Sequence, residues 1–181
     1  MNETGIKKVV AAGIGAAIYI VLARFATIPS PIPNTMIQIT FAFLALMAFI
    51  YGPVTGLAIG FIGHTINDIT AYGSPWFSWI IVTGFFGFSM GVLGKYIGLE
   101  DFNLTKIVKF IIGDIVISAI GWGILAPTLD IVLYKEPASK VFAQGMVAGT
   151  SNALTVAVLG TILILGYSKT LVNKGSLRKE D

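Results

Sequence analysis

The sequence predicts an all-α integral membrane protein of six transmembrane helices with both termini in the cytoplasm. Three observations carry this prediction. Of the 181 residues, 55% are hydrophobic and only 12% are charged, whereas a soluble domain usually carries about 25% charged residues. The mean hydropathy is +0.85. Turn residues divide the apolar sequence into six segments. We therefore expect lipid to be the solvent of a single six-helix membrane domain over residues 1–181.

Proline, glycine or polar residues separate the six expected helices. The first, Lys8 to Ile28, has the length of a spanning helix, roughly 20 residues, and stops at the prolines of PSPIPNT. A cleaved signal peptide is the alternative, but its apolar core of roughly 7–15 residues is shorter. The other five run over about Met36–Tyr51, Val54–Tyr72, Trp76–Ile97, Lys106–Leu125 and Val141–Ser168. PTLDIVLYKEPASK is the longest connection and has room for a short interfacial turn. A short polar tail follows from about residue 169.

Basic residues set the predicted orientation, because cytoplasmic loops collect Lys and Arg. With the N-terminus inside, nine of the 12 Lys and Arg residues fall on the cytoplasmic side. Only Arg24, Lys135 and Lys140 fall on the outer side. The connection 98–104 is then cytoplasmic, and the connection 128–139 is external.

The third expected helix carries the only histidine of the chain, His64, with Asp68 four residues later. Ionisable groups inside a membrane are costly and usually mark a pathway, a binding site or a paired structural bridge. A mutual hydrogen bond between two buried groups is the structural alternative to a ligand site or a proton relay. Gly52, Gly56 and Gly60 recur at every fourth position, which predicts a packing surface on the inner half of this helix.

Polar and aromatic residues from all six segments fall toward the predicted outer side. An interfacial aromatic belt would explain the three tryptophans, but it would not explain the amides, the acid and the histidine beside them. Aromatic rings with a few convergent polar groups are typical of a small-molecule pocket, and flat heterocycles stack on indole. Arg24, Thr35 and Gln144 lie on the same side. The candidate substrate-binding residues are Asn34, Gln38, His64, Asn67, Asp68, Tyr72, Trp76, Trp79 and Trp122.

Several functions are disfavoured by what the sequence lacks. It has no cysteine and a single histidine, which removes thiol nucleophiles and multi-histidine metal sites. GVLGKY at Gly91–Tyr96 has neither the spacing nor the hydroxyl of an ATP-binding phosphate loop. We therefore expect no catalytic residue, no metal, no cofactor and no nucleic-acid partner. Asp114, in the fifth segment, has a helix–helix hydrogen bond as its structural interpretation.

Small residues mark the first expected helix, in AAGIGAA at Ala11–Ala17. Ala12 and Ala16 are four residues apart and form a smooth strip near the cytoplasmic end. Such a strip serves either packing within the chain or the docking of a partner's helix.

Together these stretches resemble the substrate-binding S component of an energy-coupling factor (ECF) transporter, a vitamin-uptake system of prokaryotes. The resemblance covers nearly the whole chain. It is most specific in the strip at Ala12 and Ala16, in RFATIPSPIPNT at Arg24–Thr35, in GHTINDITAYGSPW at Gly63–Trp76, and in the basic tail. The same stretches are similar to the branch labelled riboflavin-type, whose relatives have been linked to hydroxymethylpyrimidine.

This resemblance implies a mechanism. The S component binds its vitamin in an outward-facing pocket closed by the loop after the first helix. It docks through Ala12 and Ala16 on a transmembrane coupling subunit bound to two ATPases, and it topples in the membrane to release the vitamin inside. The resemblance also implies the plasma membrane of a prokaryote, with ATP hydrolysis in the partner subunits. The competing class is a stand-alone proton-coupled secondary transporter using His64 and Asp68, which the absence of clear inverted repeats disfavours.

Overall fold

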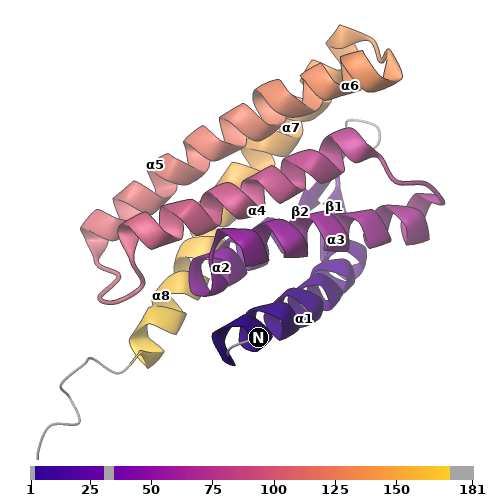
Figure 1. Cartoon of the computed structure of the whole chain (residues 1–181). Helices are drawn as coiled ribbons and strands as arrows, with labels where there is room; N and C mark the ends of the chain where they lie inside the picture. The colour runs from indigo at the N-terminus through magenta and orange to yellow at the C-terminus, as the bar shows by residue number, and fades with distance from the viewer. Residues whose placement is uncertain (1–2, 31–34, 172–181) are drawn as a thin grey trace, which may run out of the picture.

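The computed structural model describes residues 3–30 and 35–171. Within these residues the chain forms six continuous helical rods and one short β-hairpin (Figure 1). The rods are α1 (Glu3–Phe25), α2 (Thr40–Tyr51), α3 (Pro53–Tyr72), α4 (Phe77–Ile97), α5–η1–α6 (Leu104–Ile120, Gly121–Leu125 and Ala126–Tyr134) and α7–η2–α8 (Ala138–Thr155, Val156–Gly160 and Thr161–Thr170). The predicted helical architecture is therefore confirmed, with corrections at three boundaries.

The first correction is a hairpin between α1 and α2. Strand β1 (Thr27–Pro29) pairs antiparallel with β2 (Met36–Gln38), with Ile28 opposite Ile37. As a result, α1 ends at Phe25 rather than Ile28, and α2 begins at Thr40 rather than Met36. The residue before a proline is pushed from the helical to the extended region, and Ile28 precedes Pro29. Pro29 therefore favours the extended conformation that Ile28 adopts in β1.

The second correction concerns the fifth rod, which continues through the expected connection to Tyr134. A proline inside an α-helix removes a hydrogen bond and clashes with the preceding turn, which is why a break at Pro127 was expected. Instead, the turn Gly121–Leu125 is a π-helix, and the amide of Ala126 donates to the carbonyl of Gly121, five residues back. The wider turn changes the backbone hydrogen-bond register, and Pro127, which has no N–H to donate, follows it directly as the second residue of α6.

The third correction is the sixth rod, which begins at Ala138 rather than Val141 and ends at Thr170, with a second π-helical turn, η2, on the way. Pro137 stands just before this helix, where a fixed φ is tolerated. The connection that was predicted to be external is thereby reduced to residues 135–137.

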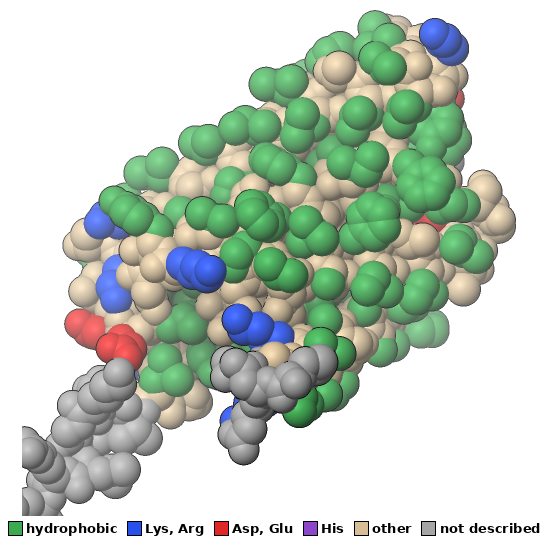
Figure 2. Space-filling view, viewed as in Figure 1, with side chains coloured by type: hydrophobic (Ala, Val, Ile, Leu, Met, Phe, Trp, Pro, Cys, Tyr) green, Lys and Arg blue, Asp and Glu red, His purple; other side chains and the backbone are tan. Residues whose placement is uncertain are grey.

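Four of the rods are long and apolar enough to cross a membrane, namely those over Gly5–Phe25, Phe77–Ile97, Leu104–Tyr134 and Ala138–Thr170. The 12-residue α2 extends about 18 Å at 1.5 Å per residue, which is less than a hydrocarbon core of about 30 Å. In Figure 2, hydrophobic side chains are spread over the whole face that α3, α4 and α5 share, with few charged side chains among them. Six transmembrane spans and cytoplasmic termini remain predictions.

Glycines bring α3 and α4 into backbone contact. A Cβ on Gly56 would collide with the carbonyl oxygen of Gly87, and a Cβ on Gly60 would lie 2.6 Å from the carbonyl oxygen of Thr83. No side chain fits between the two helices at these points. The packing surface predicted from the glycine spacing is thus confirmed, and it fixes α3, with His64 and Asp68, against the start of α4.

The two ends of the bundle differ in character. The α4–α5 connection lies beside α8, where the amide of Phe102 donates to Ser168 Oγ over 3.2 Å. The hairpin and the α3–α4 and α6–α7 connections lie at the opposite end (Figure 1). Lys and Arg side chains gather at the first end, around the α4–α5 connection and the start of α1 (Figure 2). This distribution agrees with the orientation predicted from the sequence.

Candidate functional site

A cavity of about 330 Å³ lies at the hairpin end of the bundle. Its lining comes from β2, from every rod except α1, and from the connections beside them. Ligand sites usually measure about 300–1,000 Å³ and combine aromatic walls with a few polar groups. Eight of the candidate residues line it, namely Gln38, His64, Asn67, Asp68, Tyr72, Trp76, Trp79 and Trp122. The ninth, Asn34, lies outside the described residues.

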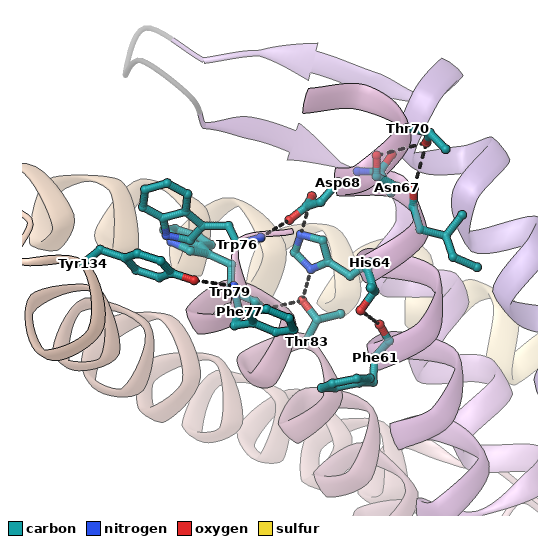
Figure 3. Close-up of polar contacts among 12 residues, drawn as sticks. Phe61, His64, Asn67, Asp68, Thr70, Trp76, Phe77, Trp79, Thr83 and Tyr134 are labelled. Atoms are coloured by element: carbon teal, nitrogen blue, oxygen red, sulfur yellow. Dashed lines mark hydrogen bonds and ion pairs between the residues drawn. The ribbon is translucent and has the colours of Figure 1, made fainter. Parts of the chain in front are cut away.

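His64 and Asp68 contact each other on α3, with Nε2 3.3 Å from Oδ1 (Figure 3). The other ring nitrogen, Nδ1, lies 2.7 Å from Oγ1 of Thr83. Thr83 donates its single hydroxyl hydrogen to the carbonyl oxygen of Trp79 over 2.9 Å, so its oxygen accepts from Nδ1–H of the histidine. Nε2 lies against the Asp68 carboxylate, so the two ring nitrogens of His64 face a hydroxyl on α4 and an acid on α3.

Asp68 also shapes the connection between α3 and α4. Its Oδ2 accepts a hydrogen bond of 3.1 Å from the backbone amide of Trp76 (Figure 3). Its side chain is buried, and it contributes one oxygen to the histidine and the other to the tryptophan's backbone. Asp68 therefore lines the cavity and also holds the backbone of Trp76, another lining residue.

Asp130 is the most important cavity residue that the sequence interpretation missed. It is buried on α6, and its carboxylate accepts the indole N–H groups of Trp76 and Trp79 at 2.7 and 2.8 Å. The hydroxyl of Ser78 donates to the same carboxylate. Asp130 was not among the candidate residues because residues 127–140 were predicted to form a connection rather than a helix. The spacing of Ala126, Asp130 and Tyr134 along one helical face was the available signal.

Aromatic rings form two walls of the cavity. Trp122, from the π-helical turn η1, contacts Phe41 and Phe86 with ring centroids 4.7 and 5.2 Å apart. Trp76 stacks on Tyr134 at 4.3 Å and 27° between the ring planes. Gly145 lets α7 approach closely, because a Cβ there would collide with the carbonyl oxygen of Trp122. The rings are thus held by packing between helices that are distant in sequence.

Three residues of the cavity lining carry buried amide oxygens without a partner. Asn67 and Asn152 are 7% and 2% exposed. Their side-chain oxygens, and that of Gln38, have no hydrogen-bond partner among the described residues. An unsatisfied buried polar group costs about 1–3 kcal/mol, so these three lining residues are candidates to accept hydrogen bonds from a ligand once their side chains adjust. The sequence interpretation missed Asn152, Glu136 and Lys140, and the latter two form an ion pair of 2.7 Å within the lining.

Some of the residues singled out from the sequence lie elsewhere. Arg24 donates to the carbonyl oxygen of Thr70 over 2.9 Å and so joins the ends of α1 and α3. Asp114 is fully buried in α5, where Ser118 donates to it over 3.3 Å, and it is not part of the cavity lining. In α1, Ala16 is 4% exposed and Ala12 packs against the core. The exposed small residues on this helix are Gly13 and Ala17.

Comparison with known proteins decides the family. The sequence matches the family described as ECF-type riboflavin transporter, S component, over residues 3–169. The chain belongs to this family. It is therefore an S component of a membrane transporter and not an enzyme, and S components of this kind work with a coupling subunit and ATPases.

The relatives of this S component are bacterial proteins of similar length. A UPF0397 protein of an Exiguobacterium species is 52% identical over 182 residues, covering 99% of this chain and 100% of the relative. UPF0397 proteins of Clostridium perfringens and Lactobacillus acidophilus are each 49% identical. These alignments cover 99% and 100% of this chain and 98% and 100% of the relatives, respectively. The similarity therefore extends over the helices that form the cavity as well as those that pack behind it.

Proposed function

We propose that this S component binds a water-soluble vitamin or vitamin precursor from outside the cell in the cavity at the hairpin end. A transmembrane coupling subunit driven by two ATPases then completes its delivery. The observation that carries the proposal is the cavity itself, in which indole rings from α4 and η1 meet a histidine, acids and partnerless amide oxygens. This composition suits a flat polar heterocycle, which stacks on indole and hydrogen-bonds at its edges.

Of the two vitamins that the family resemblance implies, we favour hydroxymethylpyrimidine over riboflavin. A cavity of about 330 Å³ lies at the low end of the range of roughly 300–1,000 Å³ for ligand sites, which suits one ring better than three fused rings with a sugar-alcohol chain. The amino and hydroxyl groups of the pyrimidine would donate hydrogen bonds. The amide oxygens of Asn67 and Asn152 are acceptors that need such donors.

The predicted orientation supports uptake from outside. The end of the bundle rich in Lys and Arg would face the cytoplasm, which turns the cavity and the hairpin toward the exterior. Thr35, Met36 and Gln38 bring the hairpin into the cavity lining, so this segment is the part best placed to cover a bound ligand. The bacterial relatives agree with a location in the plasma membrane of a prokaryote.

A stand-alone proton-coupled transporter is the second candidate. The contact of 3.3 Å between His64 and Asp68, two groups able to exchange a proton, is the observation in its favour. The two candidates differ in what the isolated chain can do in a vesicle. An S component binds its ligand but needs its partners to move it, whereas a secondary transporter accumulates it in response to a pH gradient.

Two experiments test the proposal. The protein is purified and denatured, and any released small molecule is identified by mass spectrometry. Hydroxymethylpyrimidine and riboflavin are then titrated into the ligand-free protein by calorimetry. We expect a pyrimidine to be released and rebound. Uptake of either compound by liposomes containing the chain alone, driven by a pH gradient, would replace the proposal with the second candidate.

A further inference from the structure

Both tryptophans at the start of α4 donate their indole N–H groups to the same carboxylate. Asp130 Oδ1 accepts from Trp76 at 2.7 Å, and Oδ2 accepts from Trp79 at 2.8 Å. Asp130 is 1% exposed, and the salt bridges among the described residues do not include it. A buried carboxylate without a cation needs several donors to offset its loss of hydration. The two indoles and the Ser78 hydroxyl are those donors.

This arrangement limits what the indoles can offer a ligand. An indole nitrogen has a single hydrogen and accepts no hydrogen bond. Because Asp130 takes that hydrogen from both rings, neither Trp76 nor Trp79 can donate one to a ligand. What remains for the cavity is the aromatic surface of each ring. Tyr134 stacks on one face of Trp76, which leaves the opposite face for a ligand.

The segment that carries the two tryptophans is also fixed through its backbone. The amide of Trp76 donates to Asp68 on α3. The amide of Phe77 donates to the hydroxyl of Tyr134 on α6 over 3.0 Å (Figure 3). Asp130 and Tyr134 are four residues apart, so one face of α6 holds both the side chains and the backbone at the start of α4. These backbone contacts alone leave the two indole rings free to rotate about their side-chain bonds. Hydrogen bonds to the indole N–H groups are needed to fix the ring orientation.

We propose that Asp130 is a positioning residue of the ligand site. It binds the indole N–H groups of Trp76 and Trp79 so that the two rings meet a flat ligand with their faces, and it does not contact the ligand. The proposal rests on the proposed function, because it assumes that the cavity binds a heteroaromatic compound. The proposal predicts that ligand affinity depends on Asp130, although both of its carboxylate oxygens accept hydrogen bonds from protein side chains.

The first test observes the indoles without any ligand. The chain has three tryptophans, so the protein labelled with ¹⁵N-tryptophan in lipid nanodiscs gives three indole N–H resonances, assigned by single Trp→Phe variants. In Asp130→Asn the new amide N–H₂ faces an indole donor, and at least one of the two bonds is lost. We expect the resonances of Trp76 and Trp79 to move and to exchange faster, while that of Trp122 stays in place. Unchanged resonances for both would overturn the proposal.

The second test measures affinity for hydroxymethylpyrimidine by calorimetry. Asp130→Asn should raise Kd roughly tenfold or more. Asp101→Asn is the matched control, because Asp101 lies in the α4–α5 connection with φ 48°, which asparagine tolerates. Trp79→Phe keeps an aromatic face but removes the N–H. In the wild-type background we expect this variant to raise Kd severalfold. In the Asp130→Asn background we expect it to change Kd hardly at all, because the N–H has then already lost its acceptor. Independent, multiplicative effects, or an unchanged Kd in Asp130→Asn, would contradict the proposal.

Failure of the proposed function gives a different result. If the wild-type protein binds neither hydroxymethylpyrimidine nor riboflavin, the choice of vitamin is wrong, while the resonances still decide whether Asp130 holds the indoles. If Asp130→Asn does not fold, Trp79→Phe in the wild-type background takes its place. A Kd equal to that of the wild type in that variant would overturn the positioning role.

Discussion

At the scale of single residues, the cavity is built from polar groups that support one another. His64 lies between Thr83 and Asp68, and Asp68 in turn holds the backbone of Trp76. Removing one member therefore leaves a buried donor or acceptor without its partner, which costs more than the lost bond itself. This organisation explains why a helix in an apolar bundle carries a histidine and an acid one turn apart.

A first prediction concerns this pair. Asp68→Asn should weaken binding of hydroxymethylpyrimidine about ten- to a hundredfold, since losing a charged hydrogen-bond partner costs roughly 1.5–3 kcal/mol. His64→Ala should weaken it by the same amount or less. Calorimetric titration of both purified variants, with Asp101→Asn as control, gives the comparison. Wild-type affinity in both would mean that the pair is only a structural bridge.

At the scale of elements, close helix contacts and helix irregularities locate the cavity. The glycine contacts of α3 with α4 hold its histidine and acid in place. The π-helical turn η1 places Trp122 in the lining and carries the fifth rod on to Asp130. In membrane bundles small residues set how near two helices come. The glycine contacts therefore determine the geometry of the cavity although the glycines do not line it.

A second prediction follows for the contact between α3 and α4. Gly56→Ala should destabilise the protein by about 1–3 kcal/mol, because its Cβ meets the backbone of Gly87. Gly166→Ala is the matched control, since nothing lies within 4 Å of an added Cβ there. It should stabilise α8 by about 0.5–1 kcal/mol. Thermal unfolding in detergent measures both, and equal melting temperatures would be the contrary result.

The third prediction belongs to α1. Because Ala16 is buried, Ala16→Trp should disturb the chain's own packing and lower the melting temperature. Gly13 and Ala17 are exposed, and a Cβ on Gly13 would meet nothing within 4 Å. Gly13→Trp with Ala17→Trp should therefore keep ligand binding but prevent copurification with the coupling subunit. Intact copurification of this double variant would remove the exposed face of α1 from the docking surface.

At the scale of the whole molecule, the bundle has two unlike ends. The cavity and the hairpin lie at one end, and most of the described basic residues lie at the other (Figures 1 and 2). An importer needs this polarity, because the ligand must enter from one side while the partner ATPases work on the other. The orientation predicted from Lys and Arg is consistent with it.

The fourth prediction tests that orientation. Thr105 and Ser139 are exposed at opposite ends of the bundle, and the chain has no cysteine of its own. In intact cells, a membrane-impermeant thiol reagent should label Ser139→Cys and leave Thr105→Cys unlabelled. Permeabilised cells, in which both should react, are the control. The reverse pattern in intact cells would place the cavity on the cytoplasmic side.

The sequence predicts this fold and much of this cavity because polar groups are rare in an apolar chain. His64, Asn67 and Asp68 stand out for that reason, and the glycine spacing predicts the helix contact beside them. Asp130 and Asn152 were missed for two different reasons. A proline before Asp130 indicated a loop, and only the π-helical turn lets the helix continue. Asn152 looks like any other polar residue in its segment, and only the folded arrangement brings it to the cavity.

All three tryptophans of the chain line the cavity. Almost all of the protein's intrinsic fluorescence must therefore arise from the walls of this cavity, because no tryptophan lies elsewhere in the chain. A heteroaromatic compound that stacks on these rings should quench the emission, and one that stays outside should not. The unmodified protein in detergent is thus its own optical sensor, and a panel of vitamins and precursors can be ranked by titration without a label or a radioactive substrate.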